Sequence, residues 1–158
     1  MRADLQKAIG RAWSNSVVSF GMQSYIEKTI TDSENVLYAA KAKITVGSSI
    51  DGQTITVYDL NRNISGMLIV TTQAVWHFSQ RDTGMTFEIM SLDDTNLELK
   101  KSMFSSFIRL QSSAGVSVMD IIGLNTTETN TIVKLISDSI ALIKLPLEPK
   151  KKRRKSKA

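Results

Sequence analysis

The residues able to do chemistry are few in this sequence, and His77 is its one histidine. Alternation along a strand places Trp76 and Phe78 on one face and His77 on the other, so we expect Trp76 in the core and His77 half exposed. A catalytic or metal-binding histidine needs partner carboxylates or ligands, and none is evident near it. Asp93 and Asp94 are paired carboxylates, but adjacent residues point apart, which favours a solvated turn. The sequence therefore predicts that the protein is not an enzyme.

The composition excludes further kinds of catalytic and metal-binding site. The chain has 158 residues and no cysteine, which excludes disulfides, cysteine-ligated zinc, iron–sulfur clusters and thiol catalysis. Its 8 glycines are scattered, and none forms a phosphate-binding loop of the GxxxxGK or GxGxxG type. We expect no cofactor, no metal and no small-molecule substrate. With 42% hydrophobic and 22% charged residues, the composition fits one compact domain with short extensions.

Positive charge is concentrated at one end of the sequence. Of the 20 basic residues, seven occupy the last nine positions: Lys150, Lys151, Lys152, Arg153, Arg154, Lys155 and Lys157. The other 149 residues carry 13 basic and 15 acidic side chains, a net charge of −2. We therefore expect residues 146–158 to form a disordered basic tail. Such a tail could attach to an anionic membrane surface or to nucleic acid, act as a nuclear-import signal, or only solubilise the chain.

The elements that position these residues begin with a helical segment over residues 1–33. Leu5, Ile9, Ala12 and Trp13 recur at three- and four-residue spacing, which is typical of an amphipathic helix. Two short helices with a bend fit the pattern as well as one long helix does. Trp13 is expected to pack against the rest of the fold or against a partner subunit.

From Val36 the hydrophobic period changes to two, which predicts a half-buried strand as far as Val46. A polar break follows over Gly47–Gly52, and a short extra strand is expected around Ile55. The runs 66–71 and 75–79 then form the clearest hairpin. The remaining predicted strands are separated by turns at the spacing of an antiparallel barrel: 85–89, 97–100, 104–110 and 116–122.

A terminal helix completes the predicted fold. Asn125 and Glu128 have the spacing of a capping box, and Pro146 and Pro149 are expected to end the helix. Its apolar stripe contains Ile132, Val133, Leu135, Ile136, Ile140 and Ile143. We expect this stripe to plug the open end of a small barrel of about seven antiparallel strands.

The run Gly66-Met-Leu-Ile-Val-Thr71-Thr-Gln-Ala-Val75-Trp-His-Phe78 resembles the second hairpin of bacterial pleckstrin-homology-like (PH-like) and GRAM-like domains. The resemblance extends roughly over Glu34–Lys144. Family members often carry an arginine where this sequence has Ala74, and the Gly47–Ser65 connection is longer than usual. The resemblance implies an α+β, mainly β, PH-like antiparallel barrel capped by a C-terminal α-helix and preceded by an N-terminal helical segment.

In lipid-binding members of that family, basic residues around the first hairpin hold inositol phosphates. Lys41 and Lys43 share one strand face and are candidate ligand-facing residues. The following loop carries Asp51 and has no lysine or arginine before Arg62. Because this basic cluster is incomplete, we do not expect the family's inositol-phosphate site in this protein.

The sequence thus predicts three parts: a helical segment at 1–33, a PH-like barrel domain with its capping helix at 34–145, and the tail. The leading hypothesis is a non-enzymatic module that binds a protein partner or its own copies. The alternatives are peripheral binding to anionic lipid or phosphoinositide, and non-specific attachment to nucleic acid through the tail. The longest aliphatic stretches span about four residues, far short of a membrane span, and no secretory segment follows Met1. A soluble cytoplasmic protein is expected, with nuclear or membrane-surface targeting by the tail as an alternative.

Overall fold

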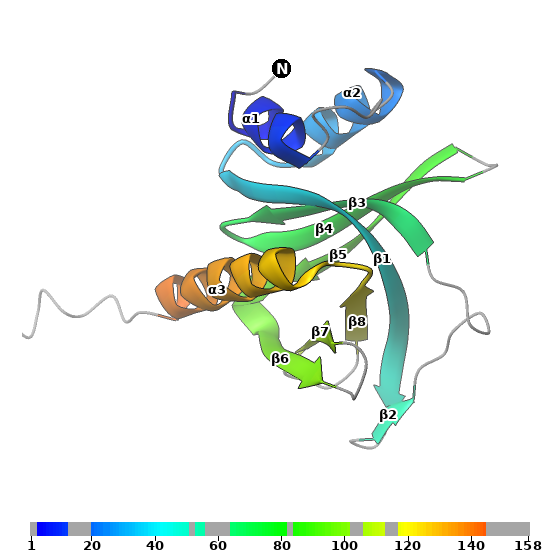
Figure 1. Ribbon diagram of the computed structural model, residues 1–158, viewed down its shortest axis with the longest axis vertical. Coiled ribbons are helices and arrows are strands. Elements are labelled where there is room, and N and C mark those ends of the chain that lie inside the picture. The colour runs from blue at the N-terminus through cyan, green and yellow to red at the C-terminus, as the bar shows by residue number, and fades with distance from the viewer. Residues whose placement is uncertain are drawn as a thin grey trace, which may run out of the picture.

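The computed structural model describes residues 3–12, 20–50, 53–55, 64–81, 84–101, 106–112 and 117–144 (Figure 1). In chain order the elements are α1 (Ala3–Ala12), α2 (Phe20–Thr29), β1 (Val36–Ile50), β2 (Gln53–Ile55), β3 (Ile64–Thr71), β4 (Ala74–Arg81), β5 (Gly84–Ser91), the 3-10 helix η1 (Leu92–Asp94), β6 (Thr95–Lys101), β7 (Ser106–Ser112), β8 (Ser117–Ile122) and α3 (Thr126–Ile143).

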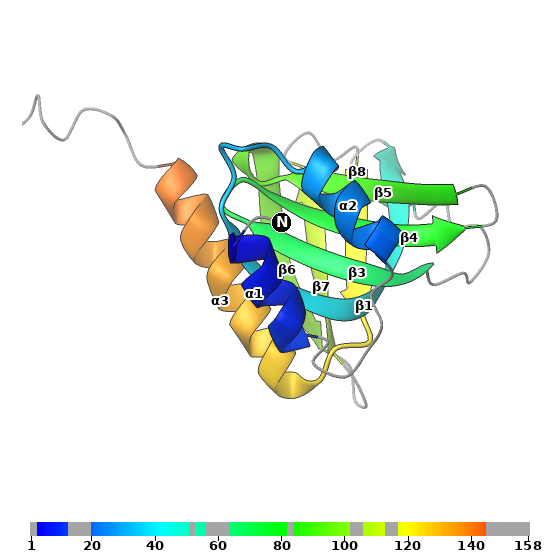
Figure 2. The same cartoon turned by 90° about the horizontal axis from the view of Figure 1, so that it is seen from above.

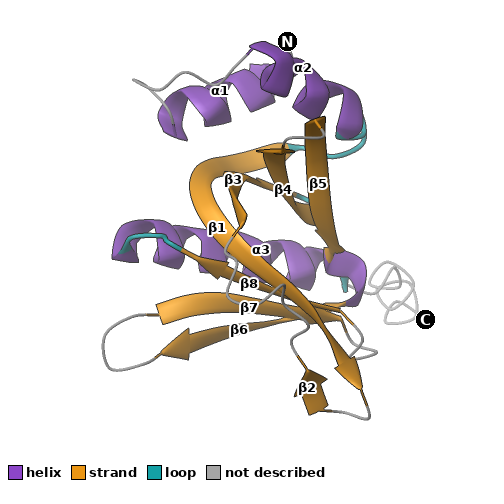
Figure 3. Cartoon of the chain, turned by 90° about the vertical axis from the view of Figure 1, so that its right-hand side faces the viewer, coloured by secondary structure: helices purple, strands orange, loops and turns teal. Residues whose placement is uncertain are grey.

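The strands form one antiparallel sheet in the order β5-β4-β3-β1-β8-β7-β6, with β2 paired to β1 outside this path. Strand β1 serves both halves of the sheet. It pairs with β3 as far as Ile44 and with β8 from Lys43 to Ser48, and its curvature turns the two halves toward each other (Figure 3). The prediction of about seven antiparallel strands is confirmed.

The predicted polar break at Gly47 was wrong. Strand β1 continues to Ile50, and Gly47 and Ser48 pair with Val118 and Ser117 of β8. Hydrogen bonding to a neighbouring strand therefore outweighs the low strand propensity of glycine and serine at these positions. The Asp51-Gly52 turn dipeptide lies outside the described residues.

The predicted C-terminal helix is confirmed: α3 packs its apolar stripe against the interior of the curved sheet (Figure 1). The capping box is present, because Glu128 N donates to Asn125 Oδ1 at 2.7 Å and Asn125 N donates to Glu128 Oε1 at 3.4 Å. Ile132 and Ile136 are fully buried in the interior core. That core, which we call the barrel core, also contains Ala40, Ala42, Ile44, Leu68, Val70, Val75, Met90, Leu92, Ile108, Leu110, Met119 and Ile121.

The outer face of β1, β3 and β4 is also buried. Helices α1 and α2 lie over β1, β3, β4 and β5 when the molecule is seen from above (Figure 2). The described residues of this segment form the helices α1 and α2, and residues 13–19, which include Trp13, lie outside the described part of the chain. The resulting second cluster, which we call the helix–sheet core, contains Leu5, Ala8, Ile26, Ile30, Val36, Ala39, Met67, Ile69, Ala74, Trp76 and Phe78.

His77 is 1% exposed, so the expectation of a half-exposed side chain was wrong. The alternation itself was correct, because Trp76 and Phe78 lie in the helix–sheet core on the opposite face of β4. Both faces are buried, since α1 and α2 cover one and the curved sheet encloses the other. The His77 Nε2 atom lies 3.0 Å from the carbonyl oxygen of Ala42, so Nε2 carries a proton and donates it to that acceptor.

Candidate binding surfaces

Lys41 and Lys43 are both exposed on the outer face of β1, as the sequence predicted. The structure brings them to one pocket of about 470 Å³, whose lining is mostly carbon. Its described lining residues are Met22, Lys41, Ala42, Lys43, Ser65, Gly66, Gln80 and Gly123. Helix α2, strands β1, β3 and β4, and the segment after β8 therefore all contribute to this site, which we call the lysine pocket.

Gly66 is required by close packing between β3 and β4. A Cβ atom at this position would lie 2.1 Å from the carbonyl oxygen of Phe78 and 2.8 Å from Cε1 of His77. Any other residue would force the Phe78 backbone or the His77 ring to move. Gly66 therefore makes room for the buried imidazole and also lines the lysine pocket.

The exposed hydrophobic side chains on the sheet gather on β5. Phe87 and Ile89 are 39% and 43% exposed, and both lie on the outer face of the strand. Phe87 is the outermost ring of an aromatic cluster, with ring centroids 5.3 Å from Trp76, 6.0 Å from Phe78 and 6.4 Å from Tyr25 of α2. Aromatic burial thus anchors Phe87 on one side while leaving its other side open to solvent.

Strand β5 is an end strand of the sheet, and among the described residues it pairs with β4 only. Its sequence contains neither lysine nor proline, the residues that commonly protect sheet edges, and Glu88 is its charged residue. A groove of about 320 Å³ runs beside it, lined by Glu88, Ile89 and Met90 of β5, Val46 and Gly47 of β1, and Ser117, Val118 and Met119 of β8. Within the described part of the chain, the outer edge of β5 therefore has no strand paired to it.

A buried carboxylate fixes the connection between α2 and β1. Glu34 is 3% exposed, and its Oε1 accepts hydrogen bonds from Thr71 Oγ1 at 2.6 Å and Trp76 Nε1 at 2.9 Å. Its Oε2 accepts from the hydroxyl and backbone N–H of Thr31, at 2.9 and 3.1 Å. Burial alone would raise the pKa of Glu34, but these hydrogen bonds together hold the pKa below its ordinary value.

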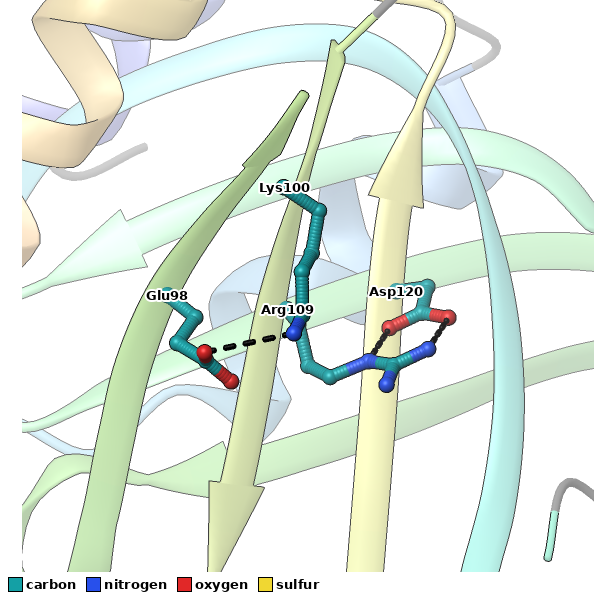
Figure 4. A network of polar contacts seen from close by, with 4 residues as sticks. All are labelled: Glu98, Lys100, Arg109 and Asp120. Carbon is teal, nitrogen blue, oxygen red and sulfur yellow. Dashed lines mark hydrogen bonds and ion pairs between the residues drawn. The ribbon is translucent and has the colours of Figure 1, made fainter. Parts of the chain in front are cut away.

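The outer face of β6, β7 and β8 carries charged side chains (Figure 4). Glu98, Arg109 and Asp120 occupy one row across the three strands. Arg109 donates to Asp120 through two parallel bonds, Nε to Oδ1 at 2.8 Å and a terminal nitrogen to Oδ2 at 2.9 Å. Lys100 pairs instead with Glu98 at 3.2 Å. The two-bond pair is largely buried, so we assign it to sheet cohesion.

The groups considered for catalysis lie apart. Asp93 and Asp94 are exposed in η1, as predicted for a solvated turn, while His77 is enclosed in the barrel. Within the described residues, no three His, Asp or Glu side chains lie close enough together to hold a metal ion. No helix among the described residues is long and apolar enough to span a membrane. The predicted polyanion-binding residues at positions 150–157 lie outside the described part of the chain.

Sequence reasoning missed Phe87, Ile89 and Glu34. An alternating strand was predicted at 85–89, but alternation gives no sign that its strand lies at a sheet edge. The sequence did offer one sign that Glu34 is buried. Glu34 stands just before a long strand, and the neighbouring hairpin contains threonines and a tryptophan that can donate hydrogen bonds to a carboxylate. Which of those residues reach Glu34 depends on the pairing of β1 with β3.

The comparisons with known proteins identify the fold. No protein-family model matches the sequence, and no curated protein is significantly similar to it. One similar structure is that of the Vav1 exchange factor, from work on the structural role of its PH and C1 domains. It superposes on 87% of this chain with a TM-score of 0.52 at 10% identity. The match spans only 36% of the Vav1 chain, so this protein corresponds to roughly a third of it.

Smaller structures match over nearly their whole length. The N-terminal PH domain of Vps36 gives a TM-score of 0.50 at 12% identity, covering 72% of this chain and 84% of that chain. The C-terminal domain of an unknown protein from Leishmania infantum gives 0.51 at 13% identity, covering 75% and 97%. At such low identities the matches show the fold alone: the chain has a PH-like fold that is mainly β, with α1 and α2 before the strands and α3 after them.

Proposed function

We propose that this protein is a non-enzymatic PH-like binding and assembly module that engages protein through the edge of β5, and that a second copy of the chain occupies this edge. The observation that carries the proposal is an unprotected end strand bearing two exposed large hydrophobic side chains, Phe87 and Ile89. Open strand edges pair readily with a further strand. An added strand would cover the groove beside Glu88–Met90 and part of the exposed aromatic surface.

The sequence of β5 suits pairing with itself. In an antiparallel dimer centred on Phe87, Glu88 stands opposite Thr86 of the second copy, and Ile89 stands opposite Met85. A register centred on Glu88 would place two carboxylates opposite each other, which is unfavourable. Such a dimer is symmetric, with the same patch used by both copies, as in most soluble homo-oligomers. The register centred on Phe87 is therefore favoured over the register centred on Glu88, because it separates the two carboxylates and brings the two Phe87 rings together.

Light scattering over a concentration series tests this proposal. An interface of one strand pair is small, so we expect a reversible dimer with a dissociation constant on the order of 10–100 μM. Ile89→Lys places a charge in the interface and should raise that constant at least roughly tenfold. Leu142→Lys is the matched control, because Leu142 is 67% exposed on α3 and lies on another element.

A mass that stays monomeric up to about 500 μM would refute self-assembly, since a dimer of the expected strength would then predominate. Equal effects of Ile89→Lys and Leu142→Lys would refute the assignment to β5. The basic residues at 150–157 are proposed, from the sequence, as an auxiliary attachment to polyanions that acts independently of the β5 edge.

A further inference from the structure

The inner face of the β4–β5 hairpin carries polar side chains among the apolar residues that fill the barrel. His77 and Ser79 of β4 are 1% and 4% exposed. The strand register places Glu88 of β5 opposite His77, and Thr86 opposite Ser79. Ser79 and Thr86 are hydrogen-bonded to each other, with their hydroxyl oxygens 3.1 Å apart. His77 and Glu88 are the second cross-strand polar pair on this face, and both of their side chains can titrate.

The geometry of the pair favours a bond only when the imidazole is protonated. Directly opposed residues of antiparallel strands have Cβ atoms about 4.5–5.5 Å apart, so a glutamate side chain can reach an imidazole across the pair. The Nε2 atom of His77 donates to the carbonyl oxygen of Ala42 at 3.0 Å. In the neutral ring Nδ1 is therefore an acceptor, and a carboxylate cannot donate to it. In the imidazolium Nδ1 carries a proton and can donate to that carboxylate.

The other groups around the imidazole do not supply an opposite charge. Within the described part of the chain, β1 and β3 present Ala42, Gly66 and Leu68 to His77. Tyr38 is titratable and lies on the inner face of β1, but it stands opposite Val70, in a different row of the sheet. The residues that β6, β7, β8 and α3 contribute to the barrel core are apolar, and the described charged residues of these elements lie on the outer face of the sheet or on the exposed side of α3.

We infer that His77 and Glu88 form a proton-linked pair, in which protonation of the buried imidazole draws the Glu88 carboxylate from the groove beside β5 onto the Nδ1 proton. In the structure Glu88 is exposed and is the charged residue among those that line this groove. An imidazolium enclosed in the barrel requires an opposite charge, because burial disfavours the charged form. Acidification therefore removes the charged side chain from the groove. The pair lies within one chain, so the inference is independent of the proposed β5 interface.

Proton NMR of the full chain tests the inference, because the chain has one histidine and hence one imidazole Cε1–H signal to follow from about pH 8 to about pH 4. Glu88→Gln keeps the size of the side chain and removes its charge, so it should lower the midpoint of the His77 titration by roughly 0.5 unit or more. Glu98→Gln is the matched control on the outer face of β6. It removes a carboxylate that is 59% exposed and should move the midpoint by less than about 0.2 unit.

A second NMR signal distinguishes direct pairing from a general effect of charge. In protein labelled with carbon-13 at the glutamate carboxyl groups, the Glu88 Cδ signal is identified by its loss in Glu88→Gln. This signal should show a step at the midpoint of the His77 titration, because the carboxylate changes partner there, whereas the Glu98 signal should show none.

Three results would overturn the inference. The first is an imidazole that stays neutral down to about pH 4, or that titrates only as the chain unfolds, which far-ultraviolet circular dichroism over the same pH range detects. The second is an equal change of the His77 midpoint in Glu88→Gln and Glu98→Gln. The third is a Glu88 Cδ signal without a step at the His77 midpoint.

Discussion

Trp76 donates a hydrogen bond of 2.9 Å from its indole Nε1 to the Oε1 atom of Glu34, 42 positions earlier in the chain. The bond joins the connection after α2 to strand β4. Thr71 of β3 binds the same carboxylate oxygen, so Glu34 holds two strands and the end of the helical segment together. Asp4 adds a second tie, because its Oδ2 accepts from Val36 N at 2.8 Å. Carboxylates of the N-terminal segment therefore fix the helices over the sheet.

Replacing Glu34 with glutamine should destabilise the protein by about 1–3 kcal/mol. The amide oxygen can still accept from Trp76 and Thr71, but the amide nitrogen then faces the two donors of Thr31. Urea denaturation measures the change. Glu98→Gln is the control on an exposed side chain, and its effect should stay within about 0.5 kcal/mol. Equal effects of the two substitutions would contradict this role of Glu34.

The same carboxylate should give acid-dependent stability. The pKa of Glu34 is lowered in the folded state, whereas an unfolded glutamate titrates near about 4.3. Its contribution is therefore fully present above about pH 4.3 and is lost as the pH falls through the lowered folded-state pKa. The difference in unfolding free energy between wild type and Glu34→Gln should shrink over that interval. A difference that stays constant from pH 6 to about pH 3 would contradict the shift.

Gly66→Ala should destabilise the protein by about 2 kcal/mol or more. The added methyl group would lie 2.1 Å from the Phe78 carbonyl oxygen, and a backbone atom in a paired strand yields less easily than a side-chain end. Ser65→Ala, at the neighbouring exposed position of β3, is the control and should stay within about 0.5 kcal/mol. Thermal unfolding of both variants makes the comparison, and similar melting temperatures would rule out the steric argument.

A double-mutant cycle on Arg109 and Asp120 should give a coupling energy of about 1–3 kcal/mol. The side chains are 20% and 7% exposed, and their two bonds are parallel. The pair Lys134–Asp138 on α3 provides the comparison, because its side chains are 76% and 60% exposed. Its coupling should be only about 0.3–0.5 kcal/mol. Couplings of the same size would contradict the contribution of burial.

Local patterns were sufficient to predict most of the fold. Period-two alternation located the strands, and the spacing of Asn125 and Glu128 located the start of α3, because both signals depend on residues close in sequence. The extent of β1 was not predictable in the same way. Gly47 and Ser48 are weak strand formers, and they pair with β8, which lies far along the chain.

The candidate sites depend even more on contacts between residues that are far apart in the sequence. Lys41 and Lys43 were correctly placed on one strand face, but the pocket is also lined by Met22 and Gly123, which lie far apart in the sequence. His77 was misplaced because helices cover the Trp76 face and the sheet curves over the other, so alternation alone could not identify a solvent side. The openness of β5 follows from sheet order, which the alternating pattern does not encode.

The basic residues at 150–157 should determine any attachment to nucleic acid. Replacing all seven with glutamine leaves the chain with a net charge of −2, which should repel DNA. A gel-retardation assay over a salt series measures the effect. If the seven charges contact phosphates, the logarithm of the binding constant should fall with the logarithm of salt concentration with a slope of up to about −6.

The matched control for this variant is Lys7→Gln/Lys134→Gln, which lowers positive charge on the folded body and should leave the slope nearly unchanged. Sequence-independent counterion release predicts equal affinity for unrelated DNA duplexes of the same length. A lack of retardation at low salt would eliminate attachment to nucleic acid through this segment. Retardation that survives the seven substitutions would instead locate the contact on the folded body, where the lysines of β1 would be the next residues to replace.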